Sequence, residues 1–416
     1  MGGYKLETII IRGARNLVTM RGARGPRRRT ALGEINVIPD GAILIRDGLL
    51  QEVGPSRRVE NLAQARDAIE INAAGRVVMP SFVDAHTHVA FPPPGIDVPD
   101  RESAVRALHA ATGHRLEART RTCLEAMARH GTTTAEVKTG GGLDEGGESK
   151  LLRVLQALRS EPLALVPTFF FRLRPGPCEK CELATEWMVS ELLPKVRRRG
   201  VAPFADLGWE SDKALLPHFE RYLQAARQLG FELKIHADGP DPAGAIELAI
   251  RHQVSSIDHL EYIDDALARR VGEAGLTVTL VPNASFDEQA RVAPARALIE
   301  AGAAIALGSN FNLSHTPTLS MQTVVALASG RLGMTLEEAL SAATINSAYA
   351  LGCGDQVGSL EPGKSADLLI LNAGHYRDLG QSLGTNLVHL AMKGGKFIYR
   401  EANVAPLPAQ ELELRY

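Results

Sequence analysis

The sequence has few cysteines, no long apolar run and almost no net charge. Its 4 cysteines, in a chain of 416 residues, are too few for a disulfide scaffold, so we expect a reducing, cytoplasmic setting. The net charge of −2 predicts no strong attraction to nucleic acid or to an anionic membrane. No apolar run approaches the length that spans a bilayer, and the first residues lack the layout of a signal peptide.

Both ends of the chain carry short strand patterns. The Asp47-Gly48 pair between the apolar segments Gly41–Arg46 and Leu49–Val53 is a strong hairpin signal. Similar short strands return near the C-terminus, and neither end is large enough to fold well alone. We therefore expect residues 1–78 and 356–416 to join in one small composite β domain.

One basic stretch interrupts the first of these regions. Residues Arg21–Arg29 read RGARGPRRR, which could form a patch for nucleic acid or phosphate. The surrounding segment offers no aromatic residues on which bases could stack. The simpler prediction is a solvated loop.

The central region, residues 79–355, alternates short apolar runs with helical patterns. The longest of these patterns covers Ser103–His130. The eight apolar runs are Pro80–Asp84, Thr132–Lys138, Leu163–Phe171, Ala202–Trp209, Phe231–His236, Val254–Asp258, Leu276–Val281 and Ala303–Gly308. Eight strand–helix units predict a (β/α)8 barrel, with an open doubly wound sheet as the alternative. No run is followed by a dinucleotide fingerprint or a P-loop, which argues against nucleotide-binding folds.

Histidines stand at the ends of several predicted strands, where the functional residues of such barrels lie. His86 and His88 follow the first run, and because strand side chains alternate they should point the same way. His236 and His259 close the fifth and sixth runs. Three neutral imidazoles from His86, His88 and His236 would leave a fourth position open for water, as in catalytic zinc sites. The alternative is a set of ordinary, hydrogen-bonded core histidines.

Other polar residues at strand ends are further candidates. Glu210, Asp238 and His259 could act as a general base, and Lys138 reads as a polar pocket residue. His315, just after the last run, could face the pocket or solvent. The pair Cys178 and Cys181 is placed in a loop, and without a second pair nearby it predicts no structural zinc site.

The motifs as a set resemble the amidohydrolase superfamily and, within it, the imidazolonepropionase family. They are PSFVDAHTH, GTTTAEVKTGGGL, KIHAD, SIDHLEY, ALGSNFN, TINSAYALG and GSLEPGKSADLLIL, and they cover nearly the whole chain. The resemblance implies a barrel with a composite β domain and one divalent metal, zinc or iron. It also implies that His86, His88 and His236 are metal ligands and that His259 is the catalytic histidine of the sixth strand. That family hydrolyses a ring C–N bond of 4-imidazolone-5-propionate.

The chain departs from the family pattern at several functional positions. The family has an aspartate that binds the metal and relays a proton where this chain has Asn310, whose neutral amide cannot accept a proton near neutral pH. Gly239 stands where the family has Glu or Gln, and Gly141 where it has Tyr. The family's substrate-clamping arginine falls in Pro92–Gly95, and Arg101 is the nearest later arginine.

We therefore expect a metal-dependent hydrolase of a non-peptide C–N bond in a cyclic amide or imidazolone-like ring. Its substrate should be a small molecule, but not 4-imidazolone-5-propionate itself. The expected site residues, besides the histidines and candidate bases above, are Asn310 at the metal and Lys138, Gly141, Arg101, Asn312 and His315 at the substrate. The alternatives are a ring deaminase, which Gly239 disfavours, and a catalytically weakened paralogue that binds a small molecule or a partner. The sequence leaves the oligomeric state open, with a homodimer as one option.

Overall fold

The computed structural model describes residues 8–92, 100–141, 144–283, 291–312 and 316–401. Its central sheet contains eight parallel strands that follow one another in chain order. They are β6 (Phe82–Asp84), β7 (Thr132–Lys138), β8 (Ala164–Arg172), β9 (Phe204–Gly208), β10 (Glu232–Ala237), β11 (Ser256–His259), β12 (Thr277–Leu280) and β13 (Ala304–Leu307). The backbone N–H of Ala85 donates to the Leu307 carbonyl at 3.2 Å, which brings the two outer strands together. The predicted barrel is thus confirmed, and the open sheet is excluded.

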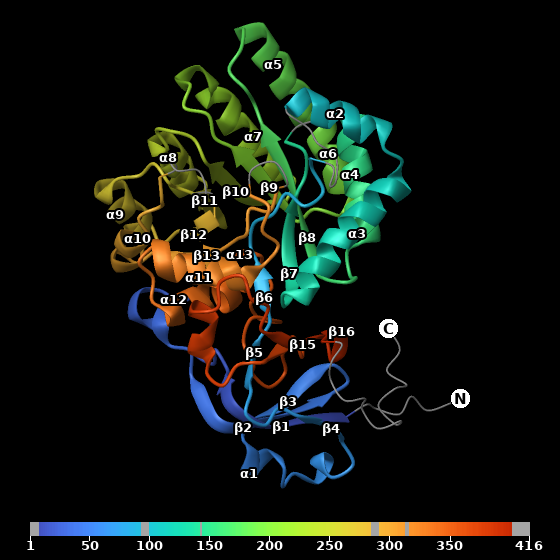
Figure 1. Cartoon of the computed structure of the whole chain (residues 1–416). Coiled ribbons are helices and arrows are strands. Elements are labelled where there is room, and N and C mark those ends of the chain that lie inside the picture. Colours follow the sequence, from blue (N-terminus) through green and yellow to red (C-terminus); the bar gives the residue numbers. More distant parts are fainter. Residues whose placement is uncertain (1–7, 93–99, 142–143, 284–290, 313–315, 402–416) are drawn as a thin grey trace.

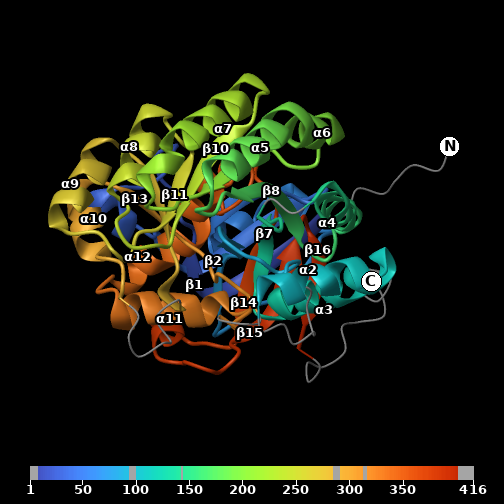
Figure 2. The same ribbon diagram turned by 90° about the horizontal axis from the view of Figure 1, so that it is seen from above.

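Helices surround this barrel on its outer side (Figure 2). They are α2 (Arg101–Ala110), α3 (Gly113–Arg129), α4 (Glu145–Ala157), α5 (Cys178–Trp187), α6 (Leu193–Arg199), α7 (Leu216–Gln228), α8 (Ala243–Arg251), α9 (Asp265–Glu273), α10 (Ala295–Ala301), α11 (Met321–Arg331), α12 (Leu336–Ser341) and α13 (Ser347–Ala350). Their apolar faces pack on the barrel strands in one large hydrophobic cluster and a second, smaller cluster around α2, α3 and α4, as amphipathic helices on a sheet must. Within the described residues, every helix falls short of what crossing a membrane would require.

Two helical predictions need correction. The single helix expected over Ser103–His130 is divided, because Ala111 is extended and the Thr112 side chain caps a new helix by accepting from the Arg115 backbone N–H. The cysteine pair is not in a loop: α5 begins at Cys178, so its first turn holds an exposed and a buried cysteine.

The two ends of the chain form a second sheet below the barrel (Figure 1). Its strands are β1 (Thr8–Val18), β2 (Val37–Arg46), β3 (Leu49–Pro55), β4 (Ile69–Asn72), β5 (Val77–Pro80), β14 (Leu368–Leu371), β15 (Val388–Lys393) and β16 (Lys396–Arg400), with a short helix, α1 (Ser56–Val59), after β3. β5 lies between β1 and β14, so the N-terminal and C-terminal strands share one sheet, as expected. The predicted hairpin is present, and Asp47 and Gly48 both adopt the left-handed conformation that its tight turn needs.

The basic stretch Arg21–Arg29 is more than a solvated loop. Arg27 is buried, and the Arg28 guanidinium donates to the backbone carbonyls of Gly275 and Gly302 at 2.8 and 3.0 Å. The stretch therefore ties the terminal sheet to the barrel, and its positive charges satisfy carbonyls where α9 and α10 end.

Asn346 holds the same stretch from the barrel side. Its fully buried side chain accepts from the Arg27 N–H at 2.7 Å and donates to the carbonyls of Arg27 and Ile305 at 2.9 and 2.8 Å. All of these hydrogen bonds join segments that are distant in sequence.

We predict that Asn346→Ala lowers the free energy of unfolding by at least about 2 kcal/mol, because each buried polar group left without a partner costs about 1–3 kcal/mol. Asn372→Ala is the matched control, since Asn372 is exposed and its side-chain bonds lie at the surface. Urea denaturation measures both. Equal midpoints for the two variants would contradict a structural role for Asn346.

Candidate active site

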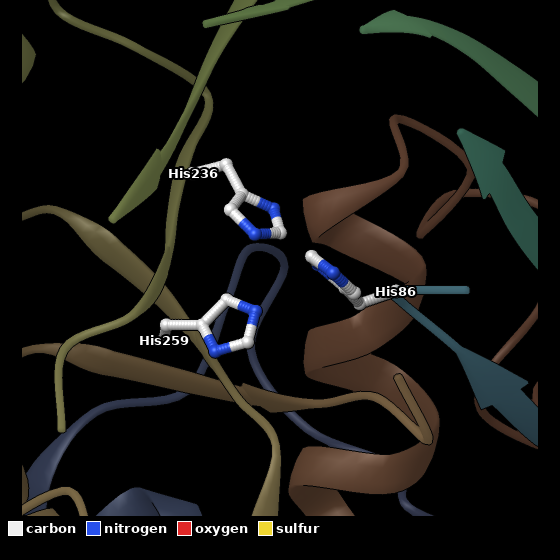
Figure 3. Close-up of side chains that lie close together, drawn as sticks. All are labelled: His86, His236 and His259. Carbon is white, nitrogen blue, oxygen red and sulfur yellow. The ribbon is translucent and has the colours of Figure 1, made fainter. Parts of the chain in front are cut away.

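Four histidines lie together where the barrel strands end. His86 and His88 follow β6, His236 belongs to β10, and His259 is the last residue of β11. Because all barrel strands are parallel, their carboxyl ends share one rim and their terminal side chains converge. Figure 3 shows the rings of His86, His236 and His259 facing one another from separate strands.

The spacing of these rings is that of a metal-binding cluster. Ring centroids are 4.5 Å apart for His236 and His259, 5.0 Å for His86 and His236, and 5.1 Å for His86 and His259. One nitrogen from each of these three lies within 4.8 Å of the others. The ring of His88 lies 5.2 Å from that of His86 and 5.8 Å from that of His236. The most compact set therefore contains His259, whereas the sequence favoured His88.

One nitrogen on each clustered ring lacks a hydrogen-bond partner. Among the described residues, nothing pairs with His86 Nε2, His236 Nδ1 or His259 Nε2, although all three are buried. Leaving such atoms unpaired costs about 1–3 kcal/mol each. A divalent metal that accepts nitrogen ligands would satisfy them, so the residues present fit such an ion.

The surroundings set the protonation of these rings. Burial lowers the pKa of His86 and His88 well below the usual value, and that of His236 to about 3. Neutral imidazole is the form that binds a metal. Burial also opposes the charged form of His259, but Glu261 Oε1 lies 3.0 Å from its Nδ1 and the pKa is raised overall.

The backbone is unusual at the same rim. His259, Leu260 and Asn310 have φ values of 78°, 69° and 48°, in the left-handed region that non-glycine residues rarely adopt. Such conformations cost about 1–3 kcal/mol each and concentrate at functional sites. Their position at the ends of β11 and β13 favours a functional rim.

A cavity of about 330 Å³ opens beside the histidines. Its lining consists of His88, Arg101, Phe170, Arg172, Arg174, His236, Asp238, His259, Asn310 and Asn312. Arg172 donates to Asp238 Oδ1 at 2.6 Å, and Arg101 donates to the carbonyls of Gly140 and Gly141 at 2.8 and 3.0 Å. The three arginines against one lining carboxylate make this cavity suited to an anionic group.

Most of the predicted site residues meet at this cavity. Glu210 stands beside it, with Oε1 3.9 Å from Arg172 Nε. Gly141 contributes its carbonyl to Arg101. His315 lies outside the described residues.

Lys138 does not line the cavity, contrary to the sequence prediction. It is fully buried inside the barrel, where its Nζ lies 2.5 Å from Asp206, 2.9 Å from Asp258 and 3.2 Å from Glu136. An ammonium has three N–H donors, and three carboxylates surround this one. Lys138 therefore belongs to an internal ion network and not to the substrate surface.

Sequence reasoning missed Arg172, Arg174, Asp206 and Asp258. The two arginines stand at and just after the end of β8. Their position at the end of a barrel strand was the sequence signal that predicts a site residue. The two aspartates lie in predicted barrel strands that are fully buried, where a charged residue is rare unless it is paired. An unpaired-looking aspartate in a predicted buried strand was therefore the sequence signal that could have identified both residues.

Solved structures share this fold at low sequence identity. A putative prolidase from Bifidobacterium longum has a TM-score of 0.70 and 19% identity, with 98% of each chain covered. N-isopropylammelide isopropylaminohydrolase from Burkholderia multivorans has a TM-score of 0.70 and 21% identity, covering 95% of this chain and 98% of that one. An adenosine deaminase from Xanthomonas campestris, with bound zinc, has a TM-score of 0.67 and 17% identity over 97% of this chain and 96% of that one. These likenesses establish the architecture alone.

Sequence relatives are closer. An imidazolonepropionase from Porphyromonas gingivalis is 36% identical over 94% of this chain and 97% of its own length. The imidazolonepropionase of Symbiobacterium thermophilum is 36% identical over 95% of this chain and 98% of its own. The model of the amidohydrolase family matches residues 77–398. The chain therefore belongs to the amidohydrolase family.

Proposed function

We propose that this chain is a metal-dependent hydrolase that cleaves a C–N bond in a cyclic amide or an imidazolone-like ring. The observation that carries the proposal is the set of buried, unpartnered histidine nitrogens beside an arginine-lined cavity. The membership of the chain in the amidohydrolase family and its imidazolonepropionase relatives support the same reaction class.

Zinc is the metal we propose, with iron as the alternative. Sets of imidazoles suit zinc, and neutral histidines are ready to bind it. His86 and His236 would hold the metal in either ligand set, and we assign the third position to His88 by its place in the motif. When bound, the ion would polarise a carbonyl and lower the pKa of a water molecule.

With His88 as the third ligand, His259 would be free to contact the substrate. Its Nδ1 is held by Glu261, so its Nε2 can face a substrate carbonyl and hydrogen-bond to it. Proton transfer is the weaker part of this site. Asn310 cannot accept a proton, because its amide is neutral. Asp238 is a weak proton acceptor, because its contacts with His236 and Arg172 lower its pKa well below the usual range despite burial. We infer a slow enzyme, since lacking a general base costs about 10²–10⁴ in rate.

The arginines restrict the substrate class. Arg101, Arg172 and Arg174 favour a ring that carries an acidic substituent. Gly141 and Gly239 offer no side chain where the resemblance expects polar groups, so we propose a substrate other than 4-imidazolone-5-propionate. With four free cysteines, we also place the protein in the cytoplasm. A homodimer stays a prediction.

Single substitutions identify the third ligand. We expect His88→Asn to weaken zinc binding by at least about 100-fold and His259→Asn by less than about 3-fold, because loss of one of three ligands affects affinity more than loss of a neighbour. Competition with a fluorescent chelator measures both dissociation constants. The reverse order would assign the ligand position to His259, and the catalytic role of that residue would then be wrong.

A second prediction concerns Asn310. We expect Asn310→Asp to raise kcat on acidic cyclic amides by about 100-fold or more, since it supplies a carboxylate as general base. Asn312→Asp is the matched comparison, because it adds the same charge to the same cavity but puts no carboxylate at the position of Asn310, so it should not raise kcat. Steady-state kinetics on a panel of such amides measures both variants. Tight metal binding without turnover in the wild type and in Asn310→Asp would point instead to a catalytically silent paralogue.

A further inference from the structure

Two lysines and three of the carboxylates that are fully buried inside the barrel form an ion network beneath the histidines. They are Glu136 and Lys138 on β7, Asp206 on β9, Lys234 on β10 and Asp258 on β11. Removing charges from water costs several kcal/mol per ion even after relaxation, and hydrophobic residues would often fill such a space with no loss of stability. Stability alone therefore does not explain why the chain keeps these ions here.

Asp258 connects this network to the histidine cluster. Its Oδ2 lies 2.8 Å from His86 Nδ1 and 2.9 Å from Lys138 Nζ, and its Oδ1 accepts from the Ser256 hydroxyl at 2.9 Å. Lys138 and Ser256 are donors, so Asp258 acts as an acceptor and the proton of the His86 contact lies on His86 Nδ1. The other nitrogen, His86 Nε2, is then left with a free lone pair, and it is the atom without a partner.

We propose that Lys138 is a positioning residue for the metal site: through Asp258, it fixes the orientation and the tautomer of His86 so that Nε2 faces the ion. This inference rests on the proposed function, because it assumes that His86 binds a metal. A ligating histidine depends on the group that holds its second nitrogen, and loss of that group costs about 10–100-fold in metal affinity. Lys138 acts one contact further out, by holding the carboxylate that holds the ring.

The second buried lysine offers a matched control. Lys234 Nζ donates to Glu136 Oε1 at 2.6 Å, and the same oxygen accepts from the Thr168 hydroxyl at 2.6 Å. Both lysines are fully buried and paired with carboxylates. Only the partners of Lys138 include the carboxylate that bonds His86. A general effect of losing a buried ammonium would therefore appear in both lysine variants.

The test measures zinc affinity of the full-length protein after removal of bound metal, by competition with a chelator of known affinity. Lys138→Met and Asp258→Asn should each weaken zinc binding about 10–100-fold, and Lys234→Met less than about 3-fold. The double variant Lys138→Met/Asp258→Asn should bind about as weakly as Asp258→Asn alone, because the two residues act along one path. Unchanged affinity in Lys138→Met, an equal loss in Lys234→Met, or fully additive losses would overturn the inference.

A second pair of variants keeps the inference testable if Lys138→Met does not fold. Asp206 and Asp258 both contact Lys138, at 2.5 and 2.9 Å, but Asp258 also bonds His86. Asp258→Asn should weaken zinc binding about 10–100-fold while Asp206→Asn leaves it within about 3-fold, and equal losses would overturn the inference. If the wild-type protein bound no zinc, iron or other divalent ion, the proposed function would fail first and the role of Lys138 with it.

Discussion

The contact between Asp258 and His86 is the interaction on which this site depends. It joins a buried ion network in the barrel interior to the histidines at the rim. Without such a hydrogen-bond partner, the imidazole rings could rotate and could adopt either neutral tautomer. Here the barrel supplies Lys138 on β7 and Asp258 on β11, so the geometry of the rim is supported by two side chains that do not themselves line the cavity.

The general architecture could be predicted from the sequence. Apolar runs that alternate with helical patterns identified all eight barrel strands, and the Asp47-Gly48 turn located a hairpin in the terminal sheet. These predictions succeed because strands buried on both faces read as continuous apolar runs, whereas the amphipathic helices between them repeat their apolar residues along one face. The division at Ala111 was missed, because capping by the Thr112 side chain starts a new helix within a continuous periodic pattern. The start of α5 at Cys178 was missed, because the prolines and the glycine just before it read as a loop.

The site could be predicted only in part. The histidines stand at strand ends, where a rule of barrel geometry points, and the structure brings them together. The function of Lys138 could not be read in the same way. Lys138 is the last residue of β7, yet its side chain lies inside the barrel. Only the positions of Asp206 and Asp258 reveal that its charge is already paired. Partners on two other strands, β9 and β11, have no signature in the sequence around Lys138.

On the function we propose, the chain keeps the histidines that would bind a metal but lacks the carboxylate that would act as general base. The histidines and their internal support are complete, whereas Asn310 replaces the acid that the resemblance expects. The arginines at the cavity give it positive charge, which is why we propose an acidic substrate. Metal binding and catalysis can therefore be tested separately, and the proposed catalysis requires metal binding.

Elemental analysis of the purified protein tests metal binding most directly. We expect close to one zinc or iron ion per chain in the wild type, and less than about one tenth of that in the double variant His86→Ala/His236→Ala, which lacks two of the proposed ligands. A wild-type protein without stoichiometric metal, or a double variant that retains it, would contradict metal binding by these histidines.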